Sequence, residues 1–149
     1  MRYSYLGDIP NVHVRDYQRK KVYDAEEQCL FWKDGIVELL SLSEMKQLVS
    51  DISHWASITP PEIQIQHTSI PTAYATADAV VLPFDKAHSK PFICHEMAHV
   101  INYQNGPADH HGPNFTGTYL SVVKNFIGRN ASTELCKSFK LKRVKYVGA

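Results

Sequence analysis

The stretch "HEMAHVINYQNGPADHHGPNF", from His95 to Phe115, decides how the rest of the chain is interpreted. It opens with an HExxH pattern, in which His95 and His99 are four residues apart. Side chains at i and i+4 lie one turn apart on a helix, so both imidazoles can reach a single ion at about 2.0–2.1 Å. Glu96 lies about 100° around the helix from His95, where its carboxylate can accept a proton from metal-bound water. The pattern therefore predicts a metal site, with Zn²⁺ as the ion and Glu96 as the general base.

The residues around this pattern define a helix with two different faces. Ser-Lys-Pro at 89–91 predicts its start and Asn-Gly-Pro at 105–107 predicts its end. On a helical wheel, the face opposite the two histidines carries apolar residues, namely Ile93, Met97, Val100 and Ile101. We therefore expect a central helix with its back in the core and its histidines toward a cleft. Cys94 points to the apolar side, which excludes it as a ligand.

A catalytic zinc site normally has a third protein ligand. The metzincin class is excluded because it needs Gly at 102 and His at 105, whereas this chain has asparagine at both positions. A glutamate from a later helix is one alternative, and an aspartate or histidine from the following loop is another. The residues alone leave four candidates open, namely Glu134, Asp109, His110 and His111.

The rest of the chain predicts an α+β fold with helices packed on a small mixed sheet of three to four strands. A helical pattern covers residues 16–31, and a second helix begins at a capping box formed by Ser41 and Glu44. Residues 62–66 alternate strictly between polar and apolar side chains, which predicts a half-exposed strand, and two more strands are predicted at 73–77 and 79–83. The strand at 73–77 has small side chains, so its edge can bind an extended peptide closely. A further helix after His111 is indicated by its apolar residues, Phe115, Tyr119, Leu120 and Val123.

Length and composition predict one domain spanning residues 1–149. Apolar residues make up 44% of the chain and charged residues 21%, which suits a folded domain with one core. The formal net charge is +1, so a general attraction to nucleic acid or anionic lipid is not expected. A local basic tail is the one exception, and we expect from it at most weak nucleic-acid binding; it comprises Lys137, Lys140, Lys142, Arg143 and Lys145.

The opening residues 1–10 lack the apolar run of a signal peptide, and no segment has membrane-spanning length, so we expect a cytoplasmic protein. Cys29, Cys94 and Cys136 are widely spaced and form no CxxC pair, which indicates free thiols. The sequence does not predict an oligomeric state.

Two motifs carry a resemblance to a known family. HEMAH at 95–99, followed by HGPNF at 111–115, resembles the active site of SprT-like (Spartan-type) zinc metallopeptidases. The resemblance implies a zincin-like minimal metalloprotease core, with His111 as the third ligand and Glu96 as the catalytic residue. The stretch "VRDYQRKKVYDAE", residues 14–26, is also similar to the opening of small predicted metallohydrolases of actinobacteria and their phages. After His111 the only cysteine is Cys136, so we expect no zinc ribbon.

The implied activity is zinc-dependent hydrolysis of a peptide bond in a protein or peptide substrate. Zinc lowers the pKa of its bound water to about 7, and Glu96 accepts the proton and passes it to the leaving amine. Tyr103, Tyr74 and Tyr119 are candidates to stabilise the oxyanion, although a core or rim role is expected more often for each. Either Asp109 or His110 is expected to hold a ligand histidine in the right tautomer. The alternative is a catalytically silent protein that uses zinc as a staple and binds a host or partner protein.

Overall fold

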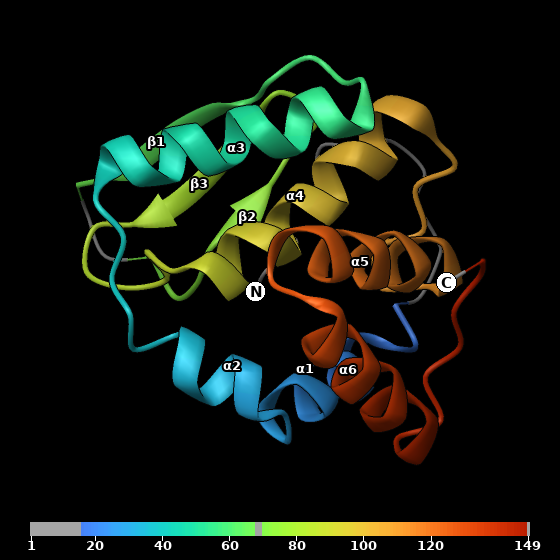
Figure 1. Ribbon diagram of the computed structural model, residues 1–149. Coiled ribbons are helices and arrows are strands. Elements are labelled where there is room, and N and C mark those ends of the chain that lie inside the picture. Colours follow the sequence, from blue (N-terminus) through green and yellow to red (C-terminus); the bar gives the residue numbers. More distant parts are fainter. Residues whose placement is uncertain (1–15, 68–69, 149) are drawn as a thin grey trace.

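The strands and most helices follow the predicted order, but residues 16–31 form two helices and the helix Arg129–Leu141 was not predicted. The structure, a computed structural model, describes residues 16–67 and 70–148. Within these ranges it is an α+β fold with six helices and a mixed three-stranded sheet (Figure 1). The elements are α1 (Arg19–Glu27), α2 (Leu30–Gly35), α3 (Leu42–Ala56), β1 (Glu62–Gln66), β2 (Tyr74–Ala75), β3 (Ala79–Pro83), α4 (Lys90–Asn105), α5 (Pro113–Phe126) and α6 (Arg129–Leu141). The predicted fold class is confirmed at this level.

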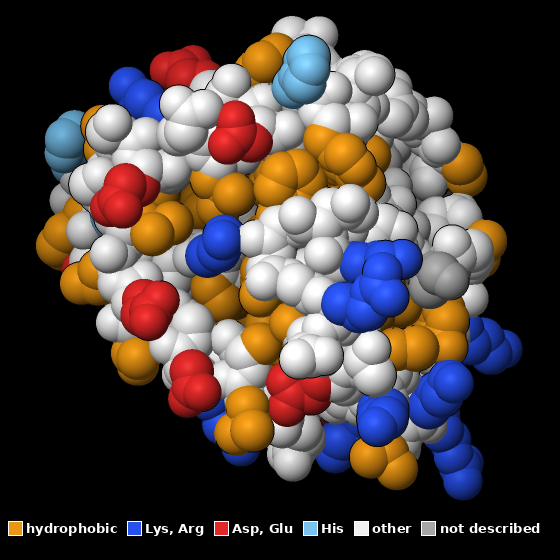
Figure 2. Space-filling view, in the orientation of Figure 1, with side chains coloured by type: hydrophobic (Ala, Val, Ile, Leu, Met, Phe, Trp, Pro, Cys, Tyr) orange, Lys and Arg blue, Asp and Glu red, His pale blue; other side chains and the backbone are white. Residues whose placement is uncertain are grey.

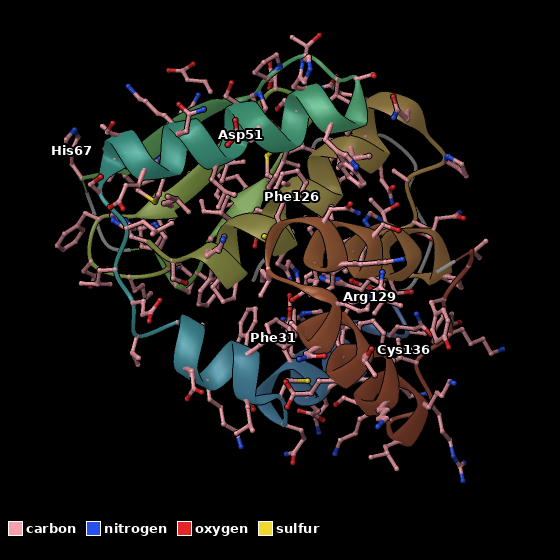
Figure 3. The ribbon with its side chains drawn as sticks, viewed as in Figure 1. Phe31, Asp51, His67, Phe126, Arg129 and Cys136 are labelled. Carbon is pink, nitrogen blue, oxygen red and sulfur yellow. The ribbon has the colours of Figure 1, made fainter. Side chains whose placement is uncertain are left out.

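The single helix predicted over residues 16–31 is wrong, because the segment folds as two helices. Cys29 between them is extended, with φ −90° and ψ 136°. The Glu134 carboxylate on α6 then accepts hydrogen bonds from the backbone N–H of Leu30 (2.7 Å) and Phe31 (3.1 Å). Figure 3 shows the Phe31 side chain on the side of α2 that faces the rest of the molecule. Since the group that caps α2 lies about a hundred residues later, the local pattern could not indicate the break.

The capping box predicted at the start of α3 is confirmed. Ser41 Oγ accepts from the Glu44 N–H at 3.1 Å, and Glu44 Oε1 accepts from the Ser41 N–H at 2.9 Å. Two of the otherwise unpaired N–H groups of the first turn are thereby satisfied. The helix ends at Ala56, and Ser57 adopts a left-handed conformation with φ 54°. The prolines at 60 and 61 therefore follow a helix that has already ended.

The sheet has the strand order β1-β3-β2. β1 is parallel to β3 and β2 is antiparallel to it. All five residues of the central strand β3 are buried, whereas β1 has only exposed and half-buried residues, as predicted for a half-exposed strand. β2 covers only two of the residues predicted at 73–77. The sheet thus has two edges, and β2 forms the one that contacts α4.

The helices build the core around α4, which contacts the sheet as well as α2, α3 and α5. Next to it, α5 packs on α6, and α6 packs on α1 (Figure 1). The C-terminal segment returns across α5, where the Val147 N–H donates to the carbonyl of Pro113 at 3.1 Å. A side chain at Gly117 would clash with the Val147 backbone, so the close approach requires glycine there. Across the described ranges, every helix is too short or too polar to cross a membrane.

Candidate metal centre

The middle of helix α4 is buried on all sides, although the sequence predicted an apolar back and histidines that face a cleft. Every residue from Ile93 to Asn102 is buried, and His95, Glu96 and His99 are at most 1% exposed. The reason is that α4 contacts the sheet on one side and helices on the others. The two histidines therefore lie in the protein interior and not along an open cleft, which corrects the prediction.

Three buried histidines converge on one point. His95 and His99 come from α4, and His111 comes from the loop just before α5. His111 Nε2 lies 3.3 Å from His95 Nε2 and 3.3 Å from His99 Nε2. One ring nitrogen from each of the three side chains lies within 4.8 Å of the other two. These side chains are positioned to bind a metal ion.

The spacing of the nitrogens fits a tetrahedral ion. Imidazole nitrogens bound at 2.0–2.1 Å with tetrahedral angles lie about 3.3–3.4 Å apart. The two measured separations of 3.3 Å match this value. Three neutral imidazoles are a ligand set that suits zinc and other divalent transition metals, so the geometry by itself does not select among them.

The third histidine of the group is His111, and the other candidates have different roles. Asp109 accepts from the backbone N–H of Asn114 (2.8 Å) and Phe115 (3.0 Å), so it caps α5. Glu134 caps α2. His110 has a left-handed φ of 59° and is not a member of the converging group. Neighbouring side chains project in different directions, which explains why only one of the adjacent histidines converges with the α4 pair.

Two carboxylates from the first part of the chain hold the other ring nitrogens. The Glu26 carboxylate on α1 pairs with Nδ1 of His95. Asp16, just before α1, accepts from Nδ1 of His111 at 2.7 Å and from its backbone N–H at 3.2 Å. The sequence predicted Asp109 or His110 in this role, whereas the carboxylates that contact the rings of His95 and His111 are Glu26 and Asp16. Both carboxylates lie within residues 14–26, the stretch that resembles the N-terminal part of small metallohydrolases. Their spacing in the sequence does not indicate that they contact histidine rings.

The three tyrosines considered as oxyanion donors lie in different places. Tyr119 donates its hydroxyl to Glu26 Oε2 at 2.7 Å, on the Nδ1 side of His95 and away from the converging nitrogens. The Tyr103 ring stacks on His99 with 6.1 Å between ring centroids and 12° between planes. Burial and, to a lesser degree, the Asp109 carboxylate raise the pKa of Tyr103. Tyr74 is half-buried on the edge strand β2. The structure thus excludes only Tyr119 from the oxyanion role.

The cysteines do not contribute to the centre. Burial raises the pKa of the Cys94 thiol to about 12 and that of Cys29 to about 11. Among the described residues, the converging group consists of His95, His99 and His111 and includes no cysteine. All three cysteines are free thiols, as predicted.

The chain matches no family model, and comparisons with curated proteins and with solved structures found no match either. The site therefore has to be interpreted from its own chemistry.

Proposed function

We propose that the protein is a zinc metallopeptidase with a zincin-like core, in which His95, His99 and His111 bind the metal and Glu96 is the catalytic base. One observation carries the proposal. Three histidine ring nitrogens converge, with His111 Nε2 at 3.3 Å from the Nε2 atoms of His95 and His99, and a fully buried carboxylate follows the first histidine on the same helix. Three protein ligands leave a fourth position for water or substrate, as in known catalytic zinc sites.

Bound zinc would act as a Lewis acid that acidifies water and polarises a carbonyl group. The proton transfers are then carried out by the protein. Glu96 accepts a proton from the attacking water and returns it to the leaving amine. Two of the ligands lie on α4 and the third lies just before α5, which packs on α4, and this packing favours a fixed geometry.

The packing of Phe115 supports the resemblance to SprT-like peptidases. In the HGPNF motif, His111 is the ligand, Gly112 is the N-cap of α5, and Pro113 is its first residue. Phe115 stacks on His99 with ring centroids 4.1 Å apart and packs at 5.0 Å from both His95 and His111. The motif thus supplies a ligand, a helix start and an apolar wall for all three rings.

The edge strand β2 is the proposed binding site for an extended peptide. Among the residues that the structure describes it pairs only with β3, and it contacts α4, the helix that carries two of the proposed ligands. A peptide added to this edge would form backbone hydrogen bonds beside the metal ligands. The substrate class is therefore proteins or peptides with an extended segment, and the proposed compartment is the cytoplasm.

Nucleic acid is a secondary partner in this proposal. Figure 2 shows Lys and Arg side chains gathered over α6 and the segment that follows it. The exposed residues of this basic face are Arg129, Lys137, Lys140, Arg143 and Lys145; Figure 3 marks Arg129 on α6. Contacts with phosphates alone give weak binding that decreases steeply with salt. Binding to a DNA duplex that persists at 200 mM salt would contradict this assignment.

A second candidate function is a protein that binds a partner and uses zinc as a structural staple. The burial of the histidines favours it, since all three are at most 1% exposed and structural zinc sites are closed. The buried Glu96 favours the peptidase, because a structural site does not need a carboxylate next to a ligand.

The Glu96→Gln variant tests the choice between the two functions. The amide has nearly the same shape but cannot act as a base, so we expect normal zinc content and complete loss of proteolysis. Cleavage products from a proteome incubated with wild type and with Glu96→Gln are compared by mass spectrometry. Glu38→Gln, at an exposed position, is the matched control and should cleave like wild type. An active Glu96→Gln protein would exclude the proposed mechanism, and an inactive wild type with bound zinc would favour the staple.

A further inference from the structure

We propose that Asp16 and Glu26 are positioning residues that hold His111 and His95 in the tautomer whose Nε2 faces the metal. The inference rests on the ligand set of the proposed function. It adds that the metal centre is organised by α1 and the residues just before it, which supply none of the three ligands.

Glu26 determines the state of the His95 ring. Its Oε2 pairs with His95 Nδ1 and also accepts from the Tyr119 hydroxyl at 2.7 Å. The carboxylate is 1% exposed and the histidine is fully buried. A neutral imidazole has one N–H, and a carboxylate at Nδ1 draws the proton to that nitrogen. The lone pair is then on Nε2, which is the atom that points to the other two histidines.

The turn that leads into α1 holds His111 by both its ring and its backbone. Asp16 Oδ2 accepts from Nδ1, and Asp16 Oδ1 accepts from the backbone N–H of the same residue. Gln18 Nε2 donates to the His111 carbonyl at 2.9 Å. Because His111 lies in a loop, these contacts replace the regular backbone pairing that fixes His95 and His99 within α4.

The negative charges of Asp16 and Glu26 should make their contacts with the two histidines depend on a bound cation. Asp16 and Glu26 are nearly buried, with side chains 7% and 1% exposed. Buried carboxylates are costly unless a positive charge compensates them. A divalent ion bound to the two histidines supplies that charge through the rings, so docking of α1 and metal binding should favour each other.

The first test compares the zinc affinity of variants by competition with a chelator. Asp16→Ala and Glu26→Ala should each weaken zinc binding by about 10–100-fold. Asp16→Asn and Glu26→Gln keep an oxygen that can accept from Nδ1, so they should recover most of the affinity. Asp24→Ala and Glu27→Ala, on the same helix but more exposed, are matched controls and should bind like wild type.

The second test reads the tautomers directly. In metal-free wild type at a pH above about 8, where ordinary imidazoles are neutral, ¹H–¹⁵N NMR should show His95 and His111 protonated at Nδ1. Asp16→Ala should convert His111 to a mixture and leave His95 unchanged, which a general loss of stability would not do. Because this measurement on wild type needs no variant, it still decides the question if Glu26→Ala does not fold.

The outcomes separate this inference from the proposed function. Folded alanine variants with wild-type zinc affinity would overturn the positioning role, as would Nε2-protonated rings in wild type. If His95→Ala itself binds zinc like wild type, the ligand set is wrong and the proposed function fails first.

Discussion

The two helices that meet at the metal centre contribute to it in opposite ways. Helix α4 carries two of the three histidines that are positioned to bind a metal ion, His95 and His99, whose spacing along one helix brings them together. Helix α1 carries none of these histidines, yet Glu26 on it and Asp16 just before it contact two of the three rings. The comparison teaches that a ligand pair can be local in sequence, while the groups that orient it are distant.

Removing a ligand should have the largest effect on this arrangement. We expect His95→Ala, His99→Ala and His111→Ala each to lose zinc affinity by more than about 100-fold, the upper range for residues that act through a ligand. Metal analysis of purified proteins and chelator competition measure it. His110→Ala is the matched control for His111 and should retain zinc. If those two variants exchange their behaviour, the third ligand is His110.

Removing the metal should affect α1 as well as α4, although of these two helices only α4 carries proposed ligands. At zinc concentrations about 100-fold above the dissociation constant, binding stabilises the folded state by about 2.7 kcal/mol. Chelation should therefore lower the melting temperature. It should also increase amide hydrogen exchange in residues 16–27 and 109–115 more than in α3. An equal increase in all helices would mean that α1 and the centre are not specifically coupled.

The cap of α3 should affect stability without affecting the metal. Ser41→Ala removes the acceptor for the Glu44 N–H and should cost about 0.5–2 kcal/mol in the free energy of unfolding. Denaturant unfolding of zinc-loaded protein measures this loss. Zinc content per chain should be unchanged, and a loss of zinc would show that α3 contributes to the centre.

The smallest expected effect is the pH dependence of the stability that Glu44 contributes at the start of α3. Hydrogen bonds from the Ser41 backbone and side chain lower the pKa of Glu44 below its ordinary value of 4.5. A lowered folded-state pKa means that the stabilisation is present above pH 4.5 and is lost as the pH falls through the folded value. The difference in denaturant unfolding midpoint between wild type and Glu44→Gln should therefore decrease as the pH falls below 4.5. A difference that stays constant down to pH 3 would contradict the assignment.

Local signals predicted most of the secondary structure. The capping box at Ser41 and Glu44, the alternation of residues 62–66 and the Pro and Gly signals around α4 all involve neighbouring residues. The failure at Cys29 has a physical cause, since α2 is capped by Glu134 from α6. Helical periodicity continues across such a break and gives no sign of it.

The burial of α4 was also beyond local prediction. A histidine pair and a glutamate among apolar residues indicate an exposed face, because polar side chains are usually solvated. The face is instead covered, as Phe115 packs on the rings of His95 and His99. Which element covers a polar face depends on how the helices are arranged, and the sequence of α4 does not contain that information.

By itself, the sequence determined the local part of the metal centre: two histidines one turn apart, a glutamate beside the first, and a later histidine at the start of the next helix. Only the tertiary structure decided among His110, His111, Asp109 and Glu134 on geometric grounds, and only it brought Asp16 and Glu26 to the rings. The physical reason is the sequence separation of the contacting residues. Helical spacing is set by backbone hydrogen bonds between near neighbours, whereas a contact between residues 69 or 95 positions apart depends on how the whole core packs.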